Sequence, residues 1–354
     1  MIPQQDRVLE HAQREFSGSP DSDSPHLLPL YQKFLRIENH RLRLRHHAGG
    51  GGREVCASRA SLIDLILRRI FAAATSSATK SETKIVPVSL LALGGYGRGE
   101  LNPGSDVDVM FLHPHTGQNV PESLQHIVGQ VLYFLWDIGF KVGHSTRSVR
   151  EALVQANGNM QTKTAMLEAR HLAGDPELFR RFRTRFRSHC VQGHEREYIV
   201  ARMQDQTQRH AKFRNSVFLQ EPNVKTGCGG LRDYQNLLWI TYFKEGALTT
   251  THLEGKDWLS PTDRRRIDAA YDFLLRVRHF LRGDAHRGEQ LVALMHNPAA
   301  DHDRDENRRS DCPSEDRQSC LSASVVHAFH DAVRESFRRI DALQHISQFR
   351  FEVH

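Results

Sequence analysis

The chain lacks the features of a membrane-spanning or a disulfide-bonded secreted protein. No uninterrupted apolar run reaches the roughly 18 residues that a transmembrane helix needs. The start, Met1 to Asp6, has no charged segment followed by an apolar one, so no signal peptide is visible. The five cysteines are an odd number without paired spacing, which argues against a disulfide framework. These absences predict a protein of the reducing cytoplasm that is not associated with a membrane.

The composition is that of a folded protein with more than one domain. The chain has 354 residues, of which 39% are hydrophobic and 25% are charged, which is enough to build a sizeable core. At roughly 150 residues per domain, this length predicts two or three domains. Lys and Arg number 48 and Asp and Glu 42, for a net charge of +6. This surplus fits binding of a nucleotide or polyanion but is too small to establish it.

The first 150 residues divide into a polar arm and an α/β unit. Residues 1–55 are polar and end with an Arg/His run and the glycines Gly49 to Gly52, which predict a helical or loose arm and a flexible joint. Residues 56–150 show alternating helical and strand patterns. Helices are expected over 58–73 and 123–138, strands over 86–93, 107–112 and 140–142, and a loop of small residues over 74–84.

After residue 150 the pattern is mainly helical, so residues 151–354 are expected to form a helical substrate-side domain. Ser260 and Asp263 have the spacing of a capping box, with Pro261 at the first helical position, and predict a helix over 260–282. Another helical stripe covers 322–347. Between them, 298–320 is rich in Asp, Arg, Ser and Asn and predicts a charged loop or disordered insert.

The chemistry is concentrated in the segment L-A-L-G-G-Y-G-R-G-E-L-N-P-G-S-D-V-D-V-M-F-L, residues 91–112. A buried strand leads to Gly94 and Gly95, where the absence of side chains lets the backbone approach a phosphate and point N–H groups at it. Arg98 adds a bidentate phosphate donor. Ser105 stands directly before the next strand, at the edge of the expected nucleotide site.

Two carboxylates stand at the head of that next strand. Asp106 and Asp108 are two residues apart, so strand alternation places both on one face. Such a pair repels itself unless a cation lies between the two groups. Mg²⁺, with Mn²⁺ as the alternative, prefers a few carboxylates together with substrate phosphates. The pair predicts a metal site that activates a nucleophile and stabilises a leaving pyrophosphate.

Each half of this pattern is weak when taken alone. An isolated G-G-x-G is more often a turn, and an isolated D-x-D is more often a solvated pair. Here the two occur together on a short loop, with Arg98 and Ser105 between them. The combination favours the functional interpretation, a catalytic site of a nucleotidyltransferase.

The string G-G-Y-G-R-G-E-L-N-P-G-S-D-V-D resembles the N-terminal catalytic domain of the PII uridylyltransferase/uridylyl-removing enzyme family, within the DNA polymerase beta-like nucleotidyltransferase superfamily. Further segments match that family in the expected order, and the resemblance covers roughly residues 50–290. These segments are Trp136-Asp137 with Val142 to Arg147, Leu167-Glu168-Ala169-Arg170 to Gly174-Asp175, and Glu221 to Lys225 with Gly229 to Asp233.

The resemblance implies an α/β (α+β) nucleotidyltransferase domain with a small mixed sheet, followed by an α-helical domain. It gives Asp106 and Asp108 the role of catalytic metal ligands, and Gly94 and Gly95 the role of holding the nucleotide. The implied reaction is Mg²⁺-dependent transfer of UMP from UTP to a tyrosine of the signalling protein PII, with release of pyrophosphate.

Departures from the family keep alternatives open. The strand candidate at 140–144 offers no third carboxylate, although the superfamily commonly has one. The sequence ends at His354 without the family's HD and ACT domains, and His330-Asp331 is interpreted as helix surface, so neither uridylyl removal nor a direct response to glutamine is expected. The alternatives are a nucleotidyltransferase acting on a small molecule or nucleic acid, and a catalytically weak module that binds PII or nucleotide. Nucleic acid is disfavoured because no basic, aromatic-lined groove is evident.

Overall fold

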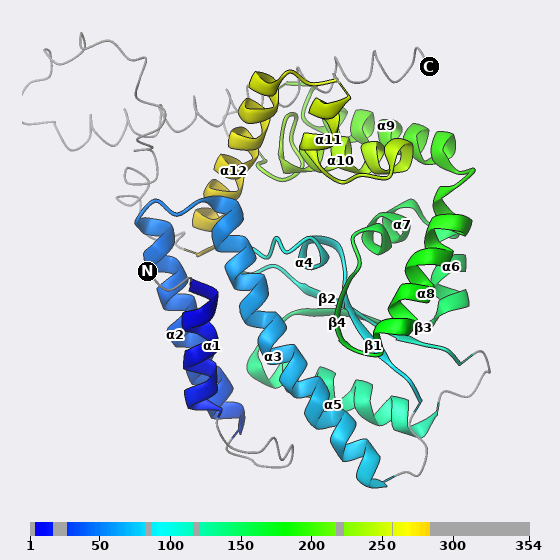
Figure 1. Cartoon of the computed structure of the whole chain (residues 1–354). Coiled ribbons are helices and arrows are strands. Elements are labelled where there is room, and N and C mark those ends of the chain that lie inside the picture. Colours follow the sequence, from blue (N-terminus) through cyan, green and yellow to red (C-terminus); the bar gives the residue numbers. More distant parts are fainter. Residues whose placement is uncertain are drawn as a thin grey trace, which may run out of the picture. The chain divides into compact units, whose positions relative to one another are not determined.

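A computed structural model describes residues 4–16, 27–81, 86–115, 121–216, 223–256 and 258–283 (Figure 1). The chain divides into two compact units. The first consists of residues 1–42 and 56–198, and the second of residues 43–55 and 199–354. Each unit is described by itself below.

The first unit is built on a small mixed sheet, as expected. Its four strands are arranged in the order β3-β2-β1-β4. β1 pairs antiparallel with both β2 and β4, and β2 pairs parallel with β3. The strands are β1 (Ser89–Ala92), β2 (Val107–His113), β3 (Val142–Ser148) and β4 (Arg170–Gly174).

Residue 150, the boundary expected from the sequence, lies inside this unit, which continues to residue 198. The reason is β4, which lies after that boundary and completes the sheet beside β1. Its sequence, R-H-L-A-G, has only one fully buried residue, Leu172. A strand with so little apolar alternation gives no clear sequence signal, and its place is decided by pairing with β1.

Two long helices pack with one face of this sheet in a single hydrophobic core. They are α3 (Gly52–Ser81) and α5 (Glu122–Ile138). The core face of β2 supplies Val107, Val109 and Phe111. Because strand side chains alternate, residues 106, 108 and 110 lie on the other face.

The loop expected over 74–84 is wrong for residues 74–81, where α3 continues. Ala74 and Ala78 are buried at helical spacing, and the hydroxyl of Thr79 donates to the carbonyl of Thr75 at 2.7 Å. Small residues therefore continue the buried face of the helix here. The expected third strand is also displaced, since β3 begins at Val142.

Shorter elements complete the first unit (Figure 1). At the start of α6, Ser148 and Glu151 form a capping box, which satisfies N–H groups at the helix start. The N-terminal arm is helical, one of the two forms expected for it. The elements are α1 (Gln4–Glu15), α2 (Leu27–His47), α4 (Gly94–Gly97), α6 (Val149–Gly158), α7 (Met160–Leu167), α8 (Pro176–Phe186) and the π-helical turn η1 (Arg187–Val191).

The second unit is helical, as expected. The capping box at α12 is present, with the N–H of Asp263 donating to the Ser260 hydroxyl at 3.0 Å and that hydroxyl to the Asp263 carboxylate at 2.8 Å. The helices are α9 (Glu195–Lys212), which begins in the first unit, α10 (Leu231–Glu245), α11 (Thr250–Gly255) and α12 (Pro261–Gly283).

The flexible joint expected at Gly49 to Gly52 is a fixed turn. The N–H groups of Gly52 and Arg53 donate to the carboxylate of Asp272 at 2.9 and 2.8 Å. A Cβ at Gly52 would lie 2.3 Å from the Asp272 carbonyl oxygen, so this glycine is required by close packing. The turn is thereby anchored to α12.

Some expectations fall on residues outside the described ranges. These are the insert at 298–320, the helix over 322–347 and the pair His330-Asp331. Among the described residues, no helix is long and apolar enough to cross a bilayer. All three cysteines of the described ranges, Cys56, Cys190 and Cys228, are buried thiols.

Candidate active site

The glycine turn follows β1 directly, where the sequence places it. Gly94 has a φ of +55°, a backbone conformation that favours glycine, and it begins the short helix α4. The N–H of Gly97 donates to the carbonyl of Leu93 at 2.9 Å. Gly94 and Gly95 are half-buried, so the start of this turn remains partly accessible.

One carboxylate, Asp106, directly precedes β2, and the other, Asp108, is the second residue of that strand. The N–H of Leu93 donates to the Asp108 carbonyl at 2.9 Å, which fixes the entrance of the turn against this position of β2. A Cβ placed on Gly94 would lie 3.7 Å from Oδ2 of Asp108. Asp106 is exposed and Asp108 half-buried. The structure therefore brings Gly94 and Asp108 together, with Asp106 on the same face.

Ser105 belongs to the turn that aims this pair. Its N–H donates to the carbonyl of Asn102 at 3.2 Å, and Gly104 has a φ of +62°. Asn102 is fully buried, which anchors the turn, whereas Ser105 is half-buried directly before Asp106.

Arg98 has protein partners that the sequence pattern did not reveal. Its Nη1 donates to both carboxylate oxygens of Glu168 at 2.6 Å, and its Nε donates to Glu100 at 2.9 Å. The Glu168 side chain is only 2% exposed. Two of the guanidinium nitrogens therefore hold the turn in place. Nη2 lies over the glycine turn, 3.7 Å from where a Cβ of Gly95 would stand.

A second ion pair supports the turn from β4. Arg170 donates to both carboxylate oxygens of Asp64 on α3, at 2.5 and 3.0 Å, and to the carbonyls of Tyr96 and Gly97, each at 3.2 Å. Burial, reinforced by the Asp64 carboxylate, raises the pKa of Tyr96 well above its usual value. Its phenol therefore stays neutral in the core.

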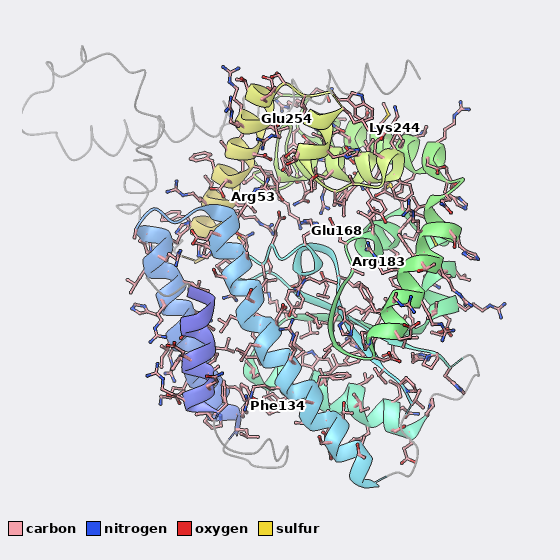
Figure 2. All side chains as sticks on the ribbon, in the orientation of Figure 1. Arg53, Phe134, Glu168, Arg183, Lys244 and Glu254 are labelled. Atoms are coloured by element: carbon pink, nitrogen blue, oxygen red, sulfur yellow. The ribbon has the colours of Figure 1, made fainter. Side chains whose placement is uncertain are left out.

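Sequence reasoning matched the segment containing Glu168 and Arg170 to the family without giving it a role. The structure shows that it supports the glycine turn from two sides (Figure 2 labels Glu168). A Cβ on Gly97 would lie 2.3 Å from the Glu168 carbonyl oxygen. In the sequence, only the match to the family pointed to this segment. The ion pair between Arg98 and Glu168, which are 70 residues apart, could be seen only in the folded structure.

The fourth matched segment forms a separate polar centre in the second unit. Asp233 is fully buried and accepts from Arg209 at 2.8 Å, from the N–H of Gly229 at 2.7 Å, and lies 2.8 Å from Nε2 of His210. Asp233 thereby joins the start of α10 to α9. This carboxylate is structural.

Two basic residues of that segment, Lys225 and Arg232, lie at its surface. Lys225 is exposed and Arg232 half-buried. The guanidinium of Arg232 lies over the Trp239 ring, 5.1 Å from its centroid, a cation–π arrangement that orients it.

The donor set at the glycine turn fits a hard divalent cation. Asp106 and Asp108 supply oxygen ligands on one face, as Mg²⁺ prefers. Among the described residues, no group of three or more His, Cys, Asp or Glu side chains could hold a metal ion. β3 likewise carries no carboxylate.

Comparisons with known proteins agree with this geometry. A family model described as putative nucleotidyltransferase DUF294 matches residues 44–163, and one described as GlnD PII-uridylyltransferase matches residues 197–300. A bifunctional uridylyltransferase/uridylyl-removing enzyme of Rhodospirillum rubrum is 37% identical over 252 residues, which are 71% of this chain and 27% of that protein. One of Bradyrhizobium sp. is 39% identical over 241 residues, 64% of this chain and 25% of that protein.

The resemblance to the PII uridylyltransferase family is confirmed. The chain carries a nucleotidyltransferase region related to these enzymes and spans about a quarter of the length of the curated relatives it matches. The first matched model contains the glycine turn and both carboxylates. The second contains the Asp233 centre and helices α10 to α12.

Proposed function

We propose that this chain transfers a nucleoside monophosphate from a nucleoside triphosphate to a protein hydroxyl, with UMP from UTP the favoured group and a tyrosine of PII the favoured acceptor. The observation that carries the proposal is the position of Asp108 on β2 beside the Gly94 turn, with Asp106 directly before that strand. The names of the relatives support uridylyl as the group and PII as the acceptor.

In this reaction the acceptor hydroxyl loses its proton to solvent or to the carboxylate pair, its oxygen forms a bond to the α-phosphorus, and the bond to pyrophosphate breaks. The glycine turn would hold the phosphates through backbone N–H groups, with Nη2 of Arg98 over the turn. Asp106 and Asp108 would hold Mg²⁺, which supplies charge stabilisation for the phosphates. Mn²⁺ would serve at the same oxygens.

Two other functions keep the same site. One is transfer to a small molecule or nucleic acid, and the other is binding of PII or nucleotide with little turnover. The pair of carboxylates beside the glycine turn favours metal-dependent transfer, because a cation held there would lie next to the phosphates and stabilise the leaving pyrophosphate.

The test is incubation of the purified chain with labelled UTP, ATP, CTP or GTP, Mg²⁺ and PII, followed by detection of label on protein. The proposal predicts label on PII that depends on UTP and on the metal. Label on PII from another triphosphate would change the base assignment. Absence of label on PII with all four would contradict the proposed transfer.

A further inference from the structure

β3 is an edge strand of the sheet, and it is the strand next to the carboxylates. The strand order places β3 at one end, paired only with β2. Its register sets Gly143 beside Asp108. A Cβ on Gly143 would lie 2.2 Å from Oδ1 of Asp108, so the carboxylate leans over the β3 backbone. The metal-binding oxygens thus lie close to an open sheet edge.

The backbone groups that β3 presents at this edge follow from its ladder. The N–H of Val107 donates to the Lys141 carbonyl at 2.8 Å. In a parallel pair, alternate residues direct both backbone groups to the same neighbour, so 141, 143 and 145 face β2 while His144 and Thr146 face outward. Ser148 is the next outward position in this alternation, and its N–H donates to the Glu151 carboxylate at 2.7 Å and not to β2.

The described strand β3 itself contains no proline, bulge or lysine. In the described ranges, no backbone segment pairs with the outer side of β3. Natural edge strands are commonly blocked by proline, a bulge or several lysines. Here the register is continuous, and the strand sequence V-G-H-S-T-R-S has one charged residue. An unprotected edge of this kind can accept an added strand.

Exposed aromatic rings lie beside β3 on the sheet face that does not carry the carboxylates. Trp136 and Tyr133 of α5 are 44% and 67% exposed, with ring centroids 5.6 Å apart. The Trp136 ring lies 6.0 Å from the ring of His144 on β3. Tyr133 also lines a pocket of about 230 Å³ with Phe134, Tyr31 and Ile70. Exposed Trp and Tyr are the residues most enriched at binding hot spots.

We propose that the outer edge of β3 is the docking strand for an extended segment of the protein acceptor, which adds to the sheet and brings its hydroxyl to Asp106 and Asp108. This rests on the proposed function. Because strand side chains alternate, one residue of the segment faces the carboxylates while its neighbours pack over Trp136. The acceptor residue is two strand spacings, roughly 10 Å, from β2, which selects a long side chain such as tyrosine over serine.

The direct test removes one outward N–H without touching the ladder to β2. Thr146→Pro does this, since proline is tolerated on an edge strand where its missing N–H faces away from the sheet. Thr146→Ala is the matched control because it keeps the N–H. Transfer from UTP to PII and binding of UTP are measured for both variants. We expect Thr146→Pro to raise the KM for PII at least fivefold, and Thr146→Ala to change it less than twofold.

The dissociation constant for UTP should stay within twofold in both variants, which separates docking from the nucleotide site. Equal KM values for PII in Thr146→Pro and Thr146→Ala, with normal transfer by the wild type, would overturn the docking proposal and leave the proposed function intact. No transfer by the wild type would instead contradict the proposed function.

A second measurement does not depend on how the proline variant folds. A peptide of about ten residues around the modified tyrosine of PII is compared with the same peptide N-methylated at alternate residues, each as a competitor of transfer by the wild-type chain. The proposal predicts that only the unmethylated peptide competes. Equal competition contradicts strand addition. A third outcome concerns a second copy of this chain. If the wild-type chain self-associates and Thr146→Pro abolishes that association, the edge of β3 pairs with a second copy and the proposal fails.

Discussion

Two loops of this chain share a Gly-Gly pair and a nearby aspartate but use the carboxylate in opposite ways. In the second unit, Asp233 is fully buried and joins α10 to Arg209 and His210 of α9. In the first unit, Asp106 is exposed and Asp108 half-buried beside the Gly94 turn. A buried, fully bonded carboxylate stabilises a fold, whereas a pair of like charges on one face is arranged for a cation.

The largest expected effect is on catalysis. Asp106→Asn or Asp108→Asn should lower transfer at least about 100-fold, because either change removes a charged metal ligand. Relief of repulsion should leave the thermal midpoint of the metal-free chain unchanged or slightly higher. Labelled-UTP transfer and thermal unfolding check both statements.

The control for this prediction is Asp137→Asn, an exposed carboxylate at the end of α5, which should transfer at the wild-type rate. Wild-type turnover by Asp106→Asn or by Asp108→Asn would refute the assigned metal site.

At the buried carboxylate of Asp233, we expect a loss of stability, in contrast to the loss of transfer expected at Asp106 and Asp108. Asp233→Asn should destabilise the second unit by about 3 kcal/mol, because Arg209 loses its fully buried counter-charge and keeps only the partly exposed Asp205. Chemical denaturation followed by circular dichroism measures the loss. If the variant is as stable as the wild type but no longer transfers, the structural assignment of Asp233 is wrong.

The ion pair that supports the glycine turn should contribute somewhat less to the free energy of unfolding than Asp233 does. Glu168→Ala removes both bonds to Nη1 of Arg98 and should cost about 2 kcal/mol of unfolding free energy, as for a partly buried bond to a charged group. Glu177→Ala is the matched control, because its ion pair with Arg180 is exposed on both sides and should contribute less than about 1 kcal/mol. Similar losses in the two variants would contradict a support role for Glu168.

A comparison of two glycine substitutions separates steric demand from backbone conformation in the same turn, and the smallest effect is expected for Gly99→Ala. Gly97→Ala places a Cβ 2.3 Å from the Glu168 carbonyl oxygen and should cost about 1–3 kcal/mol. Gly99→Ala meets no atom within 4 Å but has a φ of +75°, so it should cost only about 1 kcal/mol. Thermal unfolding of the two variants compares them, and a larger loss for Gly99→Ala would show that packing against Glu168 does not limit this position.

The sequence predicted those parts of the site that are local in the chain. β1, the Gly94 turn and the carboxylate pair follow one another within residues 89–112, so spacing alone placed them together. The partners of Arg98 could not be predicted in this way, because Glu168 lies 70 residues away. The role of Gly143 was hidden for the same reason, since it depends on the register between β3 and β2.

The same distinction between local patterns and long-range pairing explains which elements of the fold could be predicted. α5 was predicted nearly to the residue because its apolar residues repeat at helical spacing. The end of α3 was missed because Ala, Thr and Ser carry no such pattern, although Ala74 and Ala78 are buried. β4 was missed because its position depends on pairing with β1.

The most direct test of the central claim is UTP-dependent binding of Mn²⁺, followed by electron paramagnetic resonance of the free ion. The account predicts that the wild type and Asp137→Asn bind Mn²⁺ tightly only when UTP is present, because two carboxylates need phosphate oxygens to complete the coordination. Asp108→Asn should lose this binding while keeping its thermal stability. Equal UTP-dependent Mn²⁺ binding by Asp108→Asn and the wild type would contradict the account.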